Sequence, residues 1–354
     1  MSSMAKTVFE ADRATWRRSL SKIGEILGER LSAGNPGSSG KALWWGGGGS
    51  DLFTQYAGLL AGELTIADAG AFSRSHIDAS KGAATKLIEL VALEDLRRDV
   101  AGLEKIVTTG ELRDARGFLA MEKEVREHFA VSPTIGDGSA SVAIMEFALN
   151  RVDARKQTLL LSEGFRILER FGRILALTLV ADEVASSRLH PPGETLDKGL
   201  RAPTEGAAIA AFEDAGFHGV ALHWIAGENP EAVARVAGAD IRMCVIEAHK
   251  GKQGPCRELG QAVMYCGPWR EVRDDDGHSY RRGERTSVCA KTYELMTRAP
   301  YEGQFLGLRR LDEPALADAA VFDCSVTAVR DPKVTKGLAP LRPAADSGAG
   351  KGCC

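Results

Sequence analysis

The chain has 354 residues, of which 44% are hydrophobic and 26% charged, and its formal net charge is -3. This composition is typical of a globular protein with one large domain and an appendage. It lacks the basic character of a nucleic-acid-binding chain, and no apolar run is long enough for a membrane span. Seven cysteines, all in the last third, favour reduced thiols over a disulfide framework, and the polar amino terminus lacks a signal core. We therefore expect a cytoplasmic protein.

Residues 1–40 are predicted to form an amphipathic helix and a linker. Over residues 8–31, apolar side chains from Trp16 to Leu31 recur at helical spacing, with arginine and lysine between them. This apolar face could pack on the main domain, on a protein partner or on a second copy of the chain. The stretch SAGNPGSSG, residues 32–40, has the composition of a linker.

The stretch from Lys41 to Asp68 predicts a nucleotide-type site. An apolar strand ending in Trp44 and Trp45 meets four consecutive glycines. Ser50 can cap the next helix, and a second strand, Leu64–Ala67, ends in Asp68. The glycines are Gly46, Gly47, Gly48 and Gly49.

Two interpretations of this stretch are open. Glycines let a backbone approach a ligand where a Cβ would collide, and an acid about 20 residues later can bind ribose hydroxyls. A plain flexible loop, with Asp68 solvated at a strand end, is the alternative. Trp44 and Trp45 could stack on an adenine or pack in the core of a parallel sheet.

Residues 78–130 are predicted to be mostly helical, with a short third strand at Ile106–Thr109. Beyond them, strands and helices alternate up to His249. The predicted elements are a strand at Ser141–Phe147, a helix capped by Asp153 and broken by Gly172, a strand at Ile174–Val180, a helix from Thr204 to Gly216, and strands at Phe217–Ile225 and Ile241–His249. Such alternation predicts an α/β fold with a doubly wound, Rossmann-like sheet.

Asp137 lies in the turn before the strand at Ser141–Phe147. It could contact a cofactor, or it could stabilise its own turn through a side-chain hydrogen bond to the backbone.

We expect four parts in all: the helix and linker at 1–40, an α/β domain at 41–250, a small β-rich module at 251–310 and a flexible tail at 311–354. Within the module, Cys256, Cys266, Cys289 and His278 could bind a metal, but no Cys-x-x-Cys pair occurs, so buried small-residue cysteines are the alternative. Asp274–Asp276 could meet a divalent cation or form a solvated turn. The terminal Cys353 and Cys354 could bind a soft metal or metalloid.

The late chain resembles one branch of the class I S-adenosylmethionine-dependent methyltransferases, the branch that resembles arsenite methyltransferases. The similarity covers about residue 133 to the end. The segments that carry it are Lys250–Cys256, Tyr265–His278, Arg282–Arg285, Val288–Thr292, Ala299–Tyr301, Phe322–Cys324 and Thr335–Gly337. The resemblance implies a methyl-donor site over Gly46–Gly49 with Asp68 on the ribose.

Two departures from the family pattern qualify this expectation. Trp44 stands where the family has an acid, and Ser50 replaces the third glycine. The segments where arsenite methyltransferases carry cysteines read Glu146–Phe147 and Gly199–Thr204 here, without a thiol. Because As(III) seeks thiolates, arsenite is not the expected acceptor.

The expected function is therefore S-adenosylmethionine-dependent methyl transfer to an unidentified small molecule. Methyl transfer needs no catalytic triad, because the sulfonium donor is already activated. Two alternatives stay open: a catalytically inactive descendant that serves as a binding or scaffold protein, and a thiol-based metal or metalloid-binding protein.

Overall fold

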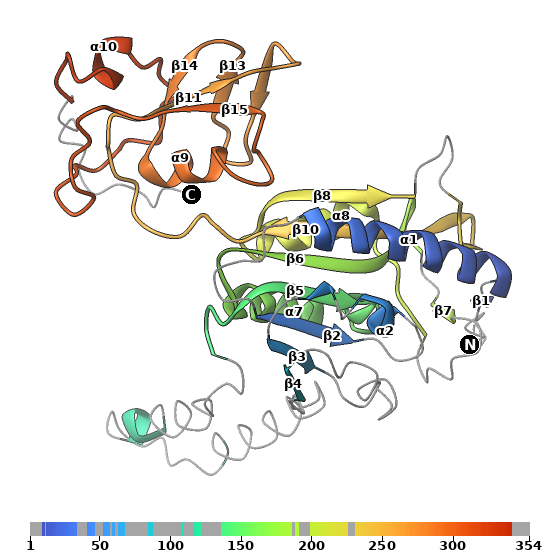
Figure 1. Cartoon of the computed structure of the whole chain (residues 1–354). Helices are drawn as coiled ribbons and strands as arrows, with labels where there is room; N and C mark the ends of the chain where they lie inside the picture. The colour runs from blue at the N-terminus through green and yellow to red at the C-terminus, as the bar shows by residue number, and fades with distance from the viewer. Residues whose placement is uncertain are drawn as a thin grey trace. The chain divides into compact units, whose positions relative to one another are not determined.

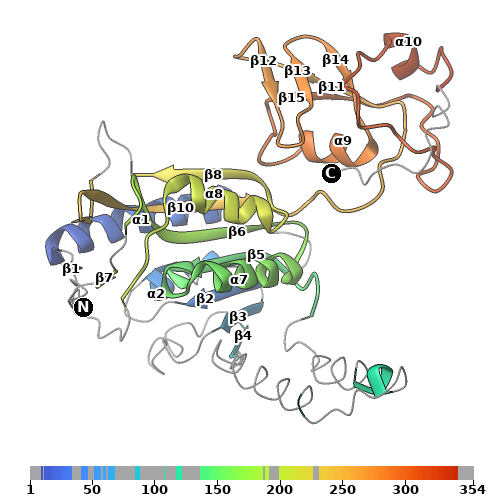
Figure 2. The ribbon, with the colours of Figure 1, turned by 180° about the vertical axis from the view of Figure 1, so that it is seen from behind.

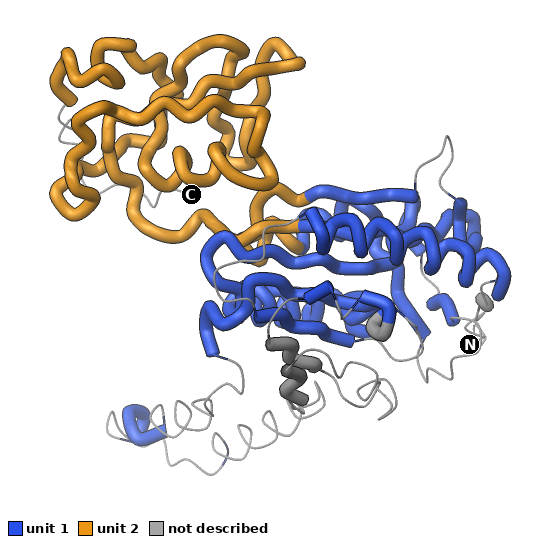
Figure 3. Tube along the Cα trace, in the orientation of Figure 1, with its two compact units in different colours: residues 1–211, 221–247 blue, residues 212–220, 248–354 orange. Residues whose placement is uncertain are grey.

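The fold is taken from a computed structural model, which describes residues 9–10, 12–33, 41–46, 52–56, 59–60, 63–67, 84–87, 108, 117–121, 136–185, 188–190, 199–225 and 231–341. The chain divides into two compact units (Figure 3). The first comprises residues 1–211 and 221–247, and the second comprises residues 212–220 and 248–354.

An eight-stranded sheet forms the centre of the first unit (Figure 1). Its strands follow the order β4-β3-β2-β5-β6-β10-β8, and β9 pairs with β10. The bounds are β2 Ala42–Gly46, β3 Glu63–Ala67, β4 Ala84–Leu87, β5 Ala140–Glu146, β6 Leu168–Ala181, β8 His218–Trp224, β9 Ala234–Val236 and β10 Ala239–His249. The strands β1, Phe9–Glu10, and β7, Leu189–His190, form a separate parallel pair.

The pairings from β4 across to β6 are all parallel. Helices cover both faces of the sheet, with α1 and α2 in front in Figure 1 and α7 and α8 in front in the reverse view of Figure 2. Their bounds are α1 Arg13–Ala33, α2 Leu52–Tyr56, α6 Ala148–Arg151, α7 Ala154–Ile167 and α8 Glu205–Asp214. The sheet and the helices on its two faces form three layers, which is the predicted α/β architecture.

The apolar face of α1 packs into the core of its own unit. Trp16, Ile23 and Leu27 of this helix are buried in one cluster with Trp44 of β2 and Tyr56 of α2. A parallel strand is buried on both faces, so the bulky side chains of β2 serve as core. The apolar residues that suggested association through α1 are buried inside this unit. Association of the chain through α1 stays a prediction.

Several predicted elements are confirmed. The strand β5 matches the expected apolar run. Asp153 caps α7 by accepting a hydrogen bond from the backbone amide of Lys156. Thr204 accepts one from Ala207 at the start of α8, and Gly216 follows that helix with a φ of 92°. These signals were readable in sequence because each is a local side-chain-to-backbone interaction.

Two local predictions are wrong. Gly172 does not separate α7 from the next strand, because β6 already begins at Leu168. A Cβ on Gly172 would lie 2.9 Å from the carbonyl oxygen of Glu169 and 3.0 Å from that of Ser141, so the glycine permits close backbone approach within the strand. Residues 84–87, predicted helical, form β4. The predicted third strand at Ile106–Thr109 lies outside the described residues apart from Thr108.

The second unit holds a three-stranded antiparallel sheet, β14-β11-β15, and a two-stranded hairpin, β12-β13. The bounds are β11 Ala262–Tyr265, β12 Glu271–Arg273, β13 Ser279–Arg281, β14 Arg285–Ser287, α9 Ala290–Met296, β15 Phe305–Leu308 and α10 Pro332–Thr335. The residues from Asp274 to His278 form the turn of this hairpin, and they include Asp274–Asp276, for which a turn was one of two expectations.

Residues 311–341, part of the segment predicted as a flexible tail, contact other residues of the second unit. Arg330 donates to both carboxylate oxygens of Glu258 at 2.9 Å, and both side chains are largely buried. Isolated bridges also pair Val321 with Arg257 and Val329 with Thr286. Backbone hydrogen bonds and one buried ion pair hold this segment. Its Ala- and Pro-rich composition gives no sign of such contacts, so the packing could not be predicted from it. The boundaries expected at 40, 250 and 310 stay predictions.

Within the part of the chain that the structure describes, no helix combines the length and the apolar character needed to cross a membrane.

Candidate functional site

The sheet order places a candidate binding edge between β2 and β5. From β2 the chain continues to β3 and β4 on one side of the sheet, then returns to β5 and continues to β6 on the other side. In doubly wound sheets, ligands bind outside the carboxyl ends of the strands at such a switch point. Here the carboxyl ends are Gly46 and Glu146, which are register partners.

Gly46 is a position that only glycine fills without strain. Its φ is 81°, in the left-handed region, and a Cβ built there would lie 2.6 Å from the carbonyl oxygen of Glu146. No real Cβ contact is that short, so a larger residue would force the backbone of β2 away from β5. The close approach of two backbones at a strand end is what the glycine run predicted.

The backbone of β5 is also unusual where the strand ends. Phe147 has a φ of 50°, a conformation that a bulky residue rarely adopts. Such positions persist only where the surroundings enforce them, and they cluster at functional sites. Its amide donates to the carbonyl oxygen of Leu177 at 2.9 Å, and its ring lies 5.8 Å from that of Trp16.

Asn150 fixes the segment that follows this bend. Its side chain is fully buried, and its amide nitrogen donates to the carbonyl oxygens of Leu179 and Arg201 at 2.8 and 2.7 Å. Its oxygen accepts from the amide of Leu179 and from the Thr178 hydroxyl, each at 3.0 Å. Four hydrogen bonds satisfy the side chain completely, so this network rigidifies the loop behind the switch point.

Trp44 belongs to the core, which decides between its two predicted roles. Its side chain is fully buried, and its indole nitrogen donates to the carboxylate of Glu146 at 3.2 Å. The resemblance implies an acid at the position of Trp44. Here the nearby carboxylate is that of Glu146, on the neighbouring strand β5. Trp45 is partly exposed.

Among the other predicted site residues, the structure describes only Asp137, which lies apart from Gly46. Asp137 precedes β5, at the amino end of the strand, whereas Gly46 lies at the carboxyl edge, about 20 Å away along seven residues. The Asp137 carboxylate is exposed and pairs with Arg166. Gly47, Gly48, Gly49, Asp68, Cys353 and Cys354 lie outside the described residues.

A buried charged network in the same unit was not recognised in the sequence. Glu247 of β10 is 2% exposed. Its carboxylate accepts from Arg30 of α1 at 2.7 Å and from Arg173 of β6 at 3.0 Å, and it lies 3.0 Å from the ring of His223 of β8. These groups tie α1 to three strands. Arg30 and Glu247 are 217 positions apart, so no local sequence pattern predicts the network.

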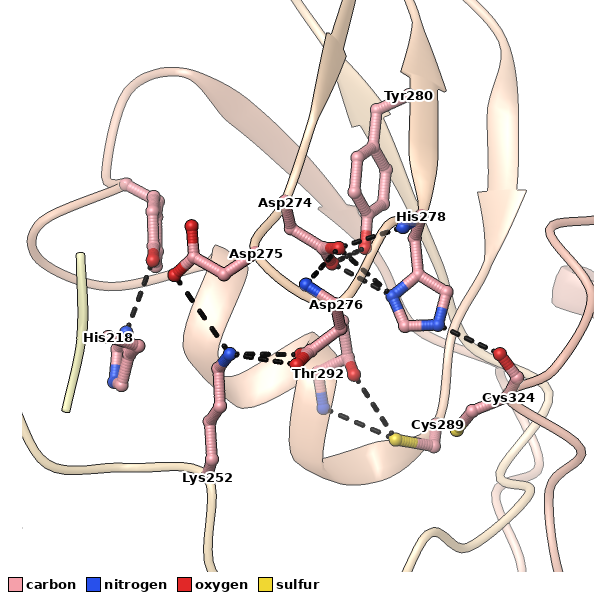
Figure 4. Close-up of polar contacts among 11 residues, drawn as sticks. His218, Lys252, Asp274, Asp275, Asp276, His278, Tyr280, Cys289, Thr292 and Cys324 are labelled. Atoms are coloured by element: carbon pink, nitrogen blue, oxygen red, sulfur yellow. Dashed lines mark hydrogen bonds and ion pairs between the residues drawn. The ribbon is translucent and has the colours of Figure 1, made fainter. Parts of the chain in front are cut away.

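The second unit holds a polar network around the β12-β13 turn (Figure 4). The carboxylate of Asp274 accepts from the Tyr280 hydroxyl and lies next to His278 Nδ1, both at 2.9 Å. His278 Nε2 lies 2.8 Å from the backbone carbonyl oxygen of Cys324. Both partners of the ring are acceptors, so both ring nitrogens donate and the imidazolium form is favoured.

Burial opposes the positive charge on His278, but the hydrogen bonds from the ring to Asp274 and to the Cys324 carbonyl outweigh it, so the pKa of His278 is raised. His278 is therefore a clamp between the hairpin turn and the segment that carries Cys324. Asp274 and Asp276 lie within 4.8 Å of His278, so these three residues are also grouped closely enough to hold a metal ion.

His218, at the start of β8, differs from His278. It is 1% exposed, and its Nδ1 lies 3.1 Å from the Tyr301 hydroxyl. Burial, together with the nearby His249 and Lys252, lowers the pKa of His218 to about 3. Lys252 pairs with Asp276 at 3.0 Å. This histidine is neutral at any ordinary pH.

Comparisons with known proteins give limited similarity. The model of a domain of unknown function, DUF8838, matches residues 252–340, within the second unit. No curated protein matches the chain.

Several structural neighbours are S-adenosylmethionine-dependent methyltransferases. An arsenic(III) S-adenosylmethionine methyltransferase from Chlamydomonas reinhardtii is 15% identical with a TM-score of 0.41, over 91% of this chain and 100% of that one. The S-adenosylmethionine-dependent methyltransferase SibL is 14% identical with a TM-score of 0.39, over 66% of this chain and 55% of that one. The [4+2]-cyclase SpnF is 12% identical with a TM-score of 0.39, over 70% of this chain and 88% of that one. The fold assignment accordingly rests on the strand order.

Proposed function

We propose that the α/β unit binds S-adenosylmethionine at the β2-β5 switch point and transfers its methyl group to a small acceptor. The observation that carries this proposal is the pair of left-handed backbone positions, Gly46 and Phe147, at the carboxyl ends of adjacent strands. One of them closes against the neighbouring carbonyl so tightly that a side chain is excluded. The two backbones therefore close together at the edge where doubly wound sheets bind nucleoside ligands.

The register of the sheet supports the role predicted for Asp68. Ala67, the last residue of β3, is the register partner of Trp45. The sequence therefore places Asp68 directly after the strand next to Gly46, on the side expected for the ribose. Gly46 would present its backbone to the donor together with the sequence-predicted Gly47–Gly49. Asp137, at the other edge of the sheet, is not part of the proposed site.

The donor, when bound, supplies an activated methyl group on a sulfonium centre. The chain then has to bind both reactants in line and keep water out, because proximity and alignment lower the barrier without a covalent intermediate. The Asn150 network holds the segment after β5 in one conformation, which is the preorganisation that such alignment requires. Arsenite is not the acceptor that we propose, because Glu146 and Phe147 stand where the related enzymes carry a cysteine.

Calorimetric titration of the full chain with S-adenosylhomocysteine tests the proposal. We expect saturable binding that Gly46→Ala weakens at least tenfold, because its Cβ meets the Glu146 carbonyl. Gly238→Ala is the matched control: Gly238 also has a left-handed φ, 99°, but its Cβ would meet nothing within 4 Å. Both variants carry backbone strain of about 1–2 kcal/mol, and only the first disturbs the switch point. Absence of heat at millimolar ligand in folded protein would remove the proposal.

One observation favours a second function, that of a methyltransferase-like binding protein without catalysis. Trp44 replaces the acid expected at the end of β2 and is absorbed into the core by its bond to Glu146. A chain that folds normally, binds no donor and co-purifies with a protein partner would support this alternative. Donor binding in the micromolar range would exclude it.

A further inference from the structure

Three cysteines that are distant in sequence meet in the second unit. Cys256, Cys289 and Cys324 are all buried, and their sulfur atoms lie within 4.8 Å of one another. Figure 4 shows two of them, with the sulfurs of Cys289 and Cys324 close together. No disulfide links the described cysteines. We call these three residues the thiol cluster.

The backbone around each member of the thiol cluster is held in place. The carbonyl oxygen of Cys256 accepts from the amide of Phe322 at 3.0 Å, and that of Arg257 accepts from Ala290 at 2.9 Å. These bonds join the Cys256 segment to the residues next to Cys324 and Cys289. The His278 clamp holds the carbonyl of Cys324 from the other side. The site is therefore preorganised by its supporting bonds rather than by the thiols alone.

The sulfur of Cys289 receives additional hydrogen bonds. The amide of Thr292 donates to it at 3.4 Å, and the Thr292 hydroxyl lies 3.3 Å away. The hydrogen bonds from the Cys324 thiol, Thr292 and the Cys256 thiol lower the pKa of Cys289, while burial opposes this effect. Donors of this kind support a metal-bound thiolate equally well.

The cluster borders a small pocket. Its volume is about 10 Å³, room for about one water-sized group, and it is lined by Cys289 and Cys324 together with Thr292, His278 and Tyr280. A small ion could thus enter, and the side of the cluster that faces the pocket would remain available for a further ligand.

We propose that Cys256, Cys289 and Cys324 form a three-thiolate site for a soft d10 cation, with Zn²⁺ as its ordinary occupant. Thiolates select this class of metal, and Zn²⁺ with three protein ligands leaves a fourth position for water or another small ligand. With Zn–S distances of about 2.3 Å, tetrahedral geometry places the sulfurs about 3.8 Å apart, so a bound ion asks for a contraction of at most about 1 Å. Each cysteine loses its proton to solvent as the metal–sulfur bond forms.

The alternative is a cluster of protonated thiols that act as small apolar side chains. The full chain, reduced and freed of metal, distinguishes the two when it is titrated with Zn²⁺ against a chromophoric chelator and, in parallel, with Co²⁺. We expect one Zn²⁺ per chain. We also expect Co²⁺ to give sulfur-to-metal charge-transfer bands and the visible absorption of a tetrahedral ion. Binding of no metal would overturn the proposal.

Variants assign the ligands. Cys289→Ser, Cys256→Ser and Cys324→Ser should each weaken Zn²⁺ binding at least 100-fold. Cys266→Ser is the matched control, because Cys266 lies in the same unit but is exposed and outside the cluster. A Cys353→Ser/Cys354→Ser double variant should bind as the wild type does. Loss of binding in that double variant, with retention in Cys289→Ser, would move the metal to the chain end and overturn the assignment.

A measurement on the wild-type chain avoids the risk that a variant misfolds. Alkylation followed by peptide mass spectrometry should show Zn²⁺-dependent protection of Cys256, Cys289 and Cys324, while Cys266 reacts at the same rate with and without the ion. Equal reactivity of the three clustered thiols with and without Zn²⁺ would reject the site. Recovery of a disulfide between two of them from the chain as purified under reducing conditions would reject it as well.

Discussion

The Glu247 network and the thiol cluster are both built from segments far apart in the chain, but they differ in the kind of groups that they bring together. Around Glu247, a buried carboxylate meets two guanidinium groups and a histidine, so the protein itself supplies the opposite charge. In the thiol cluster, three ligand atoms of one kind converge beside a small pocket. A buried carboxylate must find its partners during folding, whereas thiols can stay neutral until a cation arrives.

Replacing Glu247 should have the largest effect on stability. Glu247→Gln leaves Arg30 and Arg173 without their shared carboxylate, and removing one partner of a buried ion pair costs about 3–5 kcal/mol. Urea unfolding at pH 7 measures the loss. The exposed pair between Arg18 and Glu231 provides the control, because Arg18→Ala should leave the unfolding midpoint unchanged. A Glu247→Gln protein as stable as the wild type would show that the Glu247 carboxylate does not stabilise the fold through Arg30 and Arg173.

Zn²⁺ should stabilise only the second unit. Free Zn²⁺ at 100 times its dissociation constant adds about 2.7 kcal/mol, provided that it binds only the folded state. Hydrogen exchange locates the effect: peptides spanning Cys256, Cys289 and Cys324 should exchange more slowly, and peptides of β5 and β6 should not change. Slower exchange in both units to the same extent would contradict a Zn²⁺ site in the thiol cluster.

Acidification should affect the second unit through His218. Its pKa is about 3 in the fold and about 6.5 in the unfolded chain, so the unfolded state binds the proton first as the pH falls. The stability that the neutral ring provides is complete above pH 6.5 and is lost progressively between pH 6.5 and pH 3. The slope approaches one proton, about 1.4 kcal/mol per pH unit.

His218→Phe keeps the ring shape and removes the titration. Comparing urea unfolding of this variant and the wild type at pH 7, 6 and 5 isolates the contribution of His218. We expect the two stability curves to converge or cross as the pH falls. Parallel curves would show that His218 takes up its proton over the same pH range in the folded and unfolded states, so that this unit, like the Glu247 network, tolerates a buried charge.

The sequence predicted most of what depends on neighbours along the chain. The β5 run, the Asp153 cap and the turn before His278 all follow from local chemistry. Gly172 misled because its role lies in close backbone packing within β6, and the same residue type ends helices elsewhere. At the switch point, the Gly46 approach was predictable from the glycine run. The left-handed φ of Phe147 was not, since nothing in its side chain favours that conformation.

Long-range sites were the least predictable. Cys256 and Cys289 were recognised as possible ligands, but they were grouped with Cys266, which the fold leaves outside the cluster, and with His278, whose two ring nitrogens are already engaged. The third member, Cys324, lies in a segment whose composition suggested a flexible tail. Backbone pairing of residues 320–322 with residues 256–258 brings it in, and no sequence spacing encodes that pairing. Glu247 escaped notice for the same reason.

The return of residues 320–330 along the Cys256 segment has a consequence for biosynthesis. Because Cys324 is supplied by one of the last described segments, a ribosome-bound chain exposes Cys256 and Cys289 before their companion has emerged. During that interval the two thiols are open to oxidants and to stray metal ions. A chain truncated before Cys324 would carry Cys256 and Cys289 without the third thiol of the cluster.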